Sequence, residues 1–151
     1  MNILFVCHGN ICRSPMAEFV LKKLVQERNL TDRFTIASAA TTTDEIGNAV
    51  YPPAQRKLAE HGINCAGKYA RQITQQDYAD YDLLLGMDSA NIRDMKRFWH
   101  NDPHQKVHYL MEYTCRPGDV ADPWYTRDFE ATWQDVLAGC QGLLDYLTKG
   151  K

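Results

Sequence analysis

The sequence predicts a three-layer α/β fold in which a parallel sheet lies between helices. Short apolar runs alternate along the chain with segments whose apolar residues recur at helical spacing. Right-handed crossovers between successive parallel strands place the intervening helices on both faces of the sheet. With 151 residues, 44% of them hydrophobic, the chain can bury one core, and no linker, repeat or low-complexity segment divides it. We therefore expect a single domain over residues 1–151.

Four segments have the short, apolar character of strands buried in a parallel sheet. The first is the run Asn-Ile-Leu-Phe-Val, and the third contains three consecutive leucines. Strands are expected over residues 2–6, 33–40, 81–87 and 106–111.

The helices are predicted from their end signals as well as from their apolar spacing. Ser14 suits the N-cap of the first helix, with Pro15 at its first position and Glu18 in its first turn. Gly62 suits the C′ position of the second helix. The later helices are expected to begin at Asp88 or Ser89 and to span roughly 127–147, the latter with a largely buried apolar stripe.

The most specific motif lies between the first strand and the first helix. Cys7 follows the strand directly and Arg13 precedes the helix. Backbone N–H groups and the positive end of the helix dipole then point at one concavity, which suits a doubly charged oxyanion. The helix N-terminus and the adjacent cation favour a thiolate, so we expect Cys7 to be a nucleophile. The planar fork of Arg13 can hold two oxygens of a phosphoryl group.

The residues of this loop suit its shape. Gly9 is expected to turn the chain with positive φ, and Asn10 tolerates the same conformation. The Ser14 hydroxyl can donate to the Cys7 sulfur and stabilise the thiolate. Besides Cys7 and Arg13, the loop residues expected to contact the oxyanion are His8, Gly9, Asn10, Ile11, Cys12 and Ser14.

With Ser14-Pro15 after it, this loop resembles that of the low-molecular-weight protein tyrosine phosphatases. Matching motifs follow in the family's order over essentially the whole chain, at Ser38-Ala39-Ala40-Thr41, Ala70-Arg71-Gln72, Met87-Asp88 and Asp122-Pro123-Trp124-Tyr125. The resemblance implies a four-stranded parallel sheet of flavodoxin-like topology. It also implies hydrolysis of phosphotyrosine proteins and aryl phosphate esters through a phosphocysteine intermediate, without a cofactor.

The resemblance assigns roles near the C-terminus. Asp122 is implied to protonate the leaving oxygen and then to activate water, and a carboxylic acid beside a rigid proline suits proton transfer. Trp124 and Tyr125 are implied to line the pocket mouth and stack on a phenyl ring, with packing against the last helix as the alternative. Asp119 matches no such role, and we expect it to be a solvated loop charge.

The resemblance also implies a supporting network and shows two departures. Asn10, Ser14 and Ser38 are implied to hold the loop through side-chain hydrogen bonds. Lys68 stands where a mammalian relative would place a histidine in this network. Asp44 stands where many relatives carry Trp or Tyr beside the pocket, so it is expected to weaken aromatic stacking and to repel acidic peptides, with a solvated loop residue as the alternative.

Cys12 is expected to have a redox role. It can trap a sulfenic acid on Cys7 as a disulfide, with packing under the helix as the alternative. The other cysteines are expected to be ordinary core or surface residues, because five is an odd number and neither disulfide nor zinc spacing is present; they are Cys65, Cys115 and Cys140. No metal site is predicted.

Composition limits the partners and the location. A net charge of −2 argues against nucleic-acid binding through bulk charge. No apolar stretch suggests a membrane span, and no signal peptide is recognised, so a cytoplasmic protein is expected. We expect a monomer, with a weak dimer as the alternative.

Two other functions share this loop. Thioredoxin-linked arsenate reductases use two further, closely spaced cysteines, whereas Cys65 and Cys115 are fifty positions apart. A phosphate-binding module or phosphocysteine carrier does not need Arg13 and Asp122 together. An assay with phosphotyrosine and with arsenate, in EDTA, separates the three.

Overall fold

Four parallel strands form the middle layer of the computed structural model, which describes residues 1–149. The strands are β1 (Asn2–Cys7), β2 (Thr35–Ala40), β3 (Leu83–Gly86) and β4 (Val107–Tyr109). Their order is β2-β1-β3-β4, so β1 is central and pairs with both β2 and β3. The predicted four-stranded parallel sheet is confirmed, and this strand order is that of the flavodoxin-like sheet.

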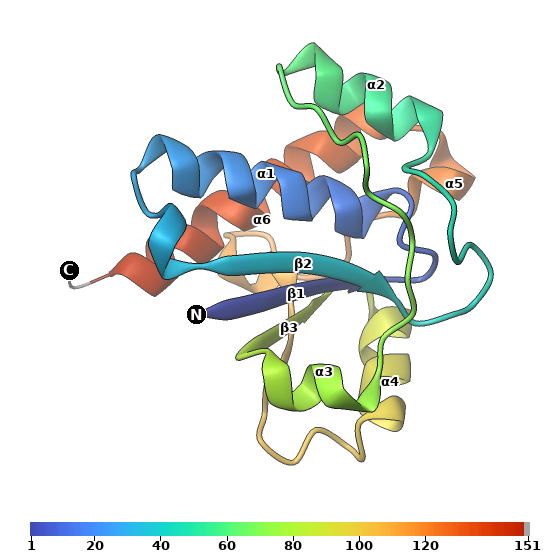
Figure 1. The fold of residues 1–151 in the computed structure, drawn as a ribbon, viewed down its shortest axis with the longest axis vertical. Helices are drawn as coiled ribbons and strands as arrows, with labels where there is room; N and C mark the ends of the chain where they lie inside the picture. The colour runs from blue at the N-terminus through green and yellow to red at the C-terminus, as the bar shows by residue number, and fades with distance from the viewer. Residues whose placement is uncertain (150–151) are drawn as a thin grey trace.

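Helices cover both faces of the sheet, which confirms the three layers (Figure 1). On one face lie α1 (Arg13–Glu27), α2 (Pro52–Glu60) and α6 (Phe129–Thr148). On the other lie α3 (Gln75–Asp80) and α4 (Ser89–Phe98), while the single turn α5 (Pro123–Thr126) precedes α6. Within residues 1–149, no helix is both long enough and apolar enough to cross a membrane.

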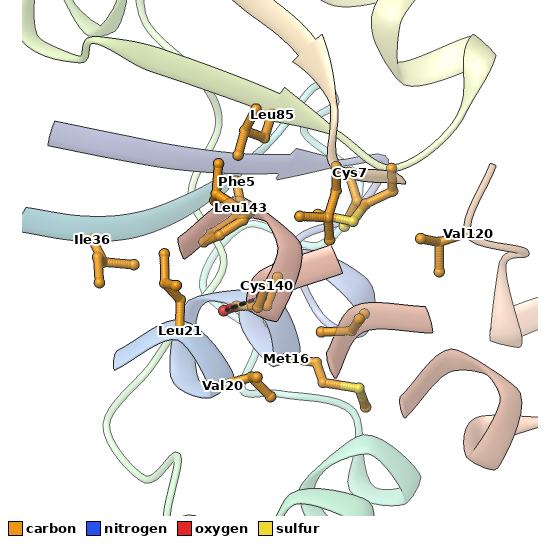
Figure 2. Packing of buried hydrophobic residues seen from close by; sticks show 14 of the residues in the cluster. Phe5, Cys7, Met16, Val20, Leu21, Ile36, Leu85, Val120, Cys140 and Leu143 are labelled. Atoms are coloured by element: carbon orange, nitrogen blue, oxygen red, sulfur yellow. Dashed lines mark hydrogen bonds between the residues drawn. The ribbon is translucent and has the colours of Figure 1, made fainter. Parts of the chain in front are cut away.

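Side chains of β1 alternate between two cores, as the period of two in a strand requires. Ile3, Phe5 and Cys7 face the core shared with α1 and α6, whereas Leu4 and Val6 face the core shared with α4. Figure 2 shows Cys7 at the edge of the first core, with Phe5 and residues of α1 and α6 beside it. The strand that carries Cys7 is thus buried on both sides.

The first helix begins two residues earlier than predicted, so the prediction of Ser14 as its N-cap is wrong. Cys12 occupies the N-cap and Ser14 lies inside the first turn, fully buried. The Ser14 hydroxyl contacts the Cys7 sulfur and the Asn10 amide, and it is therefore engaged in the loop. Glu18 lies beyond the first turn, where it is buried and bonded to Ser38.

The other end signals were read more accurately. Gly62 follows the last turn of α2 with φ of 74°, and Asp88 caps α4 through the Asn91 N–H. The predicted strands over 33–40 and 106–111 are shorter in the structure. They are shorter because 3-10 turns occupy Thr31–Arg33 and Leu110–Tyr113. Helix α3 was not predicted, although Thr74 and Asp77 form a capping box at its start.

Candidate active site

A cavity of about 570 Å³ opens at the carboxyl edge of the sheet, where ligands of such folds bind. Segments distant in sequence meet there: the end of β1, the start of α1, the loop after β2, helix α4 and the turn α5. The predicted site residues that line it are Cys7, His8, Gly9, Ile11, Cys12, Arg13, Asp44, Asp122, Trp124 and Tyr125. The other three predicted residues, Asn10, Ser14 and Ser38, are buried beneath the loop.

Two groups of the loop point at the Cys7 sulfur. The backbone N–H of Asn10 donates to Sγ at 3.3 Å, and the Ser14 hydroxyl lies 3.0 Å from it. The Asn10 amide already donates to Ser14 Oγ at 2.8 Å, so the Ser14 proton points at the sulfur or at the Ala39 carbonyl, which lies 3.5 Å away. The Cys7 sulfur thus lies within hydrogen-bond reach of two groups of its own loop.

The Asn10 side chain holds the loop to the rest of the fold. Its amide nitrogen donates to Ser14 Oγ and to Ser38 Oγ, and its carbonyl oxygen accepts from the Arg71 N–H at 3.2 Å. Ser38 in turn donates to the buried Glu18 carboxylate at 2.6 Å. Because Asn10 has a φ of 58°, these bonds hold the left-handed residue of the turn in place.

Lys68 joins this network from the far side. Its ammonium donates to the Ser38 carbonyl at 2.8 Å and lies 3.4 Å from the Glu18 carboxylate. Burial lowers the pKa of Lys68, and the Glu18 charge opposes part of that effect. The lysine is thus a second positive partner of the buried Glu18, which also binds Lys22 at 2.6 Å.

Gly9 does not adopt the positive φ that was predicted for it. Asn10 takes the left-handed position instead, and the reason for a small residue at Gly9 is space. A Cβ atom there would lie 3.3 Å from the Glu45 side chain. Glycine therefore allows the loop that follows β2 to approach residues 7–13, which we call the phosphate loop.

Arg13 is 2% exposed and is held by acceptors from two other segments. Its Nη1 donates to Asp88 at 2.6 Å and to the Val120 carbonyl at 2.9 Å. Burial works to lower the pKa of the guanidinium, but Cys7 and the neighbouring carboxylates outweigh it and raise the pKa. Arg13 is therefore a fixed positive charge in the wall of the cavity.

Asp122 faces the same guanidinium. Its Oδ2 lies 3.3 Å from Arg13 Nη2, and its Oδ1 accepts the Trp124 N–H at 3.0 Å as the N-cap of α5. Pro123 is the first residue of this turn. One oxygen is thus used to hold the turn, while the other lies beside Arg13.

Cys12 is buried beside the nucleophile candidate. Burial is the main cause that raises the pKa of its thiol to about 12, and the negative charges of Cys7 and Asp122 add to it. Within residues 1–149 all five cysteines are free; Cys65 and Cys140 are buried and Cys115 is exposed.

The rim of the cavity combines aromatic and acidic side chains. Trp124 and Tyr125 both line it, with exposed fractions of 42% and 82%. His8 Nε2 lies 2.9 Å from the Asp44 carboxylate, and both residues line the cavity.

Three contributions were missed in the sequence. Asp88 was read as a helix cap, but it also binds Arg13; its position directly after a buried strand, at the same edge as Cys7, is the signal that could have found it. Glu18 lies in the network beneath the loop, four positions before the cation Lys22 that it binds. Asp119 is exposed in its loop, as expected, and it also accepts from the Ser89 N–H and hydroxyl at the start of α4.

A buried thiol with two donors, a fixed guanidinium and a carboxylate around one cavity is the arrangement of a cysteine-dependent phosphatase. The comparisons with known proteins agree. The family model described as low molecular weight phosphotyrosine protein phosphatase matches residues 2–151.

Relatives match over nearly their full length. The low molecular weight phosphotyrosine protein phosphatase of Sus scrofa is 40% identical over 149 residues, covering 95% of this chain and 94% of the relative. The low molecular weight protein-tyrosine-phosphatase YfkJ of Bacillus subtilis is 37% identical, covering 100% of this chain and 98% of its own.

Solved structures give the same result. The crystal structure of YfkJ superposes with a TM-score of 0.96 at 35% identity and covers 100% of this chain and 96% of that one. SP-PTP of Streptococcus pyogenes superposes with a TM-score of 0.89 at 41% identity, covering 99% and 94%. The chain belongs to the low molecular weight phosphotyrosine protein phosphatase family, and it is a protein tyrosine phosphatase that acts on phosphotyrosine-containing substrates.

Proposed function

We propose that Cys7, Arg13 and Asp122 carry out the reaction. The Cys7 thiolate attacks phosphorus while the bond to the aryl oxygen breaks, and Asp122 delivers its proton to that oxygen. Arg13 and the loop N–H groups stabilise the charge on the equatorial oxygens. Water, deprotonated by Asp122, then displaces the cysteine sulfur and releases phosphate.

One observation carries this assignment most directly: the fixed cation lies between the thiol loop and the acid. Arg13 begins the helix that follows the Cys7 loop, and its Nη2 is 3.3 Å from Asp122 Oδ2. A phosphoryl group bound by the loop and Arg13 therefore has its leaving oxygen near a carboxyl group. Positioning of this kind supplies much of the rate acceleration in phosphoryl transfer.

The supporting residues follow from the same geometry. We propose that Asn10, Ser14 and Ser38 hold the loop, and that His8, Gly9, Ile11 and Cys12 surround the bound phosphoryl group. Trp124, Tyr125 and Asp44 are proposed to contact the rest of the substrate at the rim. The whole chain is proposed to act as one domain, as a cytoplasmic monomer; size-exclusion chromatography with light scattering tests the monomer.

The role of Asp122 is tested by the variant Asp122→Asn, which keeps the cap of α5 and removes the proton. Its penalty in kcat/KM is expected to increase from p-nitrophenyl phosphate to phosphotyrosine, because tyrosine is the more basic leaving group. Asp119→Asn is the matched control, since Asp119 accepts from the Ser89 N–H and hydroxyl and does not line the cavity. A penalty that does not depend on the leaving group would assign the proton to another residue.

A further inference from the structure

Arg127 ends the turn α5 in a backbone conformation that normally favours glycine. Its φ is 61° and its ψ is 12°, in the left-handed region, and its N–H donates to the Pro123 carbonyl at 2.9 Å. An arginine here has a backbone cost that glycine would avoid. The contacts of the side chain therefore have to offset this backbone cost.

That side chain makes two contacts beside the cavity. Its Nη1 donates to the Tyr51 hydroxyl at 2.9 Å, and its guanidinium lies 5.5 Å from the centre of the Trp124 ring. The Tyr51 and Trp124 rings pack against each other with centroids 4.9 Å apart. The three side chains form a cluster, which we call the aromatic clamp (Tyr51, Trp124 and Arg127).

The aromatic clamp connects the phosphate loop to the turn that carries Asp122. The Tyr51 N–H donates to the carbonyl of Ile11, in the phosphate loop, at 2.8 Å. On the side of the acid, the backbone N–H of Trp124 donates to the Asp122 carboxylate at 3.0 Å. A continuous path of contacts therefore runs from the phosphate loop through Tyr51 to the acid.

The turn that carries Asp122 needs such support. It is four residues long, and an isolated turn of that length does not persist by its own hydrogen bonds. Tyr125 and Thr126, at its outer end, are exposed. A displacement of about 1 Å at a catalytic group can cost up to a hundredfold in rate, so small movements of this turn matter.

We propose that Arg127 is a positioning residue that holds Trp124 against Tyr51 and so keeps the Asp122 carboxyl group over the phosphate loop. The proposal rests on the acid role assigned to Asp122 above. Arg127 acts on proton transfer to the leaving group and leaves binding of the phosphoryl group to the loop unchanged.

The test is a double-mutant cycle in kcat/KM. Arg127→Met removes the charge and the hydrogen bond, and it is expected to lower kcat/KM for phosphotyrosine by roughly 3- to 10-fold, the scale of one cation–π contact and one hydrogen bond. The loss for p-nitrophenyl phosphate is expected to be smaller. In the Asp122→Asn background, Arg127→Met is expected to leave kcat/KM unchanged for both substrates, because the proton of the acid is already absent.

Companion variants separate positioning from a general effect on stability. Tyr51→Phe, which keeps the ring and removes the acceptor, should reproduce part of the loss, and Arg127→Lys should restore part of it. Arg127→Gly relieves the backbone and should raise the melting temperature while losing activity as Arg127→Met does. Arg28→Met, which breaks an exposed ion pair at the far end of α1, is the matched arginine control and should have no effect on kcat/KM.

Three results overturn the proposal, and they differ from a failure of the acid role. Equal losses from Arg127→Met for both substrates, or equal losses with and without the Asp122 proton, would show that Arg127 does not act through Asp122. A flat leaving-group dependence for Asp122→Asn alone contradicts the acid role itself. A normal Asp122→Asn profile with no effect of Arg127→Met overturns only the positioning role.

Discussion

Two cysteines of one loop have different chemical environments. The Cys7 sulfur lies beside the Ser14 hydroxyl and accepts the Asn10 N–H, whereas burial raises the pKa of the Cys12 thiol to about 12. Cys12 therefore keeps its proton at neutral pH, and peroxide should oxidise Cys7 first. A sulfenic acid on Cys7 can then be attacked by the Cys12 sulfur, which releases water and forms a disulfide.

Peroxide treatment followed by dithiothreitol tests this order of events. Wild-type protein is expected to recover its activity, because dithiothreitol reduces the Cys7–Cys12 disulfide. Cys12→Ser is expected to stay largely inactive, since its sulfenic acid proceeds to irreversible oxidation states. Cys115→Ser, which changes an exposed cysteine, is the control and should recover like wild type. Equal recovery of all three proteins would assign Cys12 to packing alone.

At the scale of elements, helix α6 packs closely on the 3-10 turn Leu110–Tyr113 through two glycines. A Cβ atom at Gly142 would lie 2.0 Å from the Tyr113 carbonyl oxygen, and one at Gly139 would lie 2.6 Å from Leu110. The contact at Gly142 is with backbone, so no change of rotamer can relieve it. The glycines thus set the distance between α6 and the segment that follows β4.

Gly142→Ala is expected to destabilise the protein despite the higher helix propensity of alanine. The propensity gain is about 1 kcal/mol, whereas overpacking against fixed backbone costs roughly 1–3 kcal/mol or more. Urea unfolding should give a lower midpoint than wild type, while Gln141→Ala, on the exposed side of the same helix, should give a midpoint at or above it. A Gly142→Ala protein as stable as wild type would contradict the close packing described.

The elements differ in how well local sequence predicts them. β1 and β3 are short apolar runs, and α4 has a capping residue whose partner lies three positions away. Their positions are therefore predicted from the sequence to within about two residues. The start of α1 was misplaced because the Ser14 hydroxyl is bonded to Cys7 and Asn10 across the loop. The pairing of Arg13 with Asp88 spans 75 positions, and only the assembled sheet brings the two together.

At the scale of the whole molecule, the mouth of the cavity has an acidic rim (Asp44, Glu45 and Asp94). Asp44 and Glu45 lie in the loop after β2, and Asp94 lies across the cavity on α4. Arg13 is the arginine that lines the same cavity among the described residues, where no lysine does. Arg13 is buried in the wall of the cavity, so a bound peptide meets the acidic rim first.

Phosphotyrosine peptides with basic flanks are therefore expected to have a higher kcat/KM than peptides with acidic flanks. Added salt should narrow the difference, because exposed charges are screened over about 8 to 10 Å. Asp44→Asn should also reduce the difference in kcat/KM between the two kinds of peptide. Asp32→Asn, in the 3-10 turn before β2, should leave this difference unchanged. Identical rates for both peptides at low salt would mean that the acidic rim does not contact the substrate flanks.

The phosphocysteine mechanism is tested most directly by trapping the phosphorylated protein during turnover. Wild-type and Asp122→Asn proteins are mixed with a ³²P-labelled aryl phosphate in EDTA, quenched in acid and digested. In wild type we expect the label on the peptide that contains Cys7. Asp122→Asn should hold more label, because loss of the base slows hydrolysis of the intermediate. Cys7→Ser should hold no label and should also lack turnover. Turnover by Cys7→Ser above a contamination control, or turnover by wild type with label at another residue, would contradict the phosphocysteine mechanism.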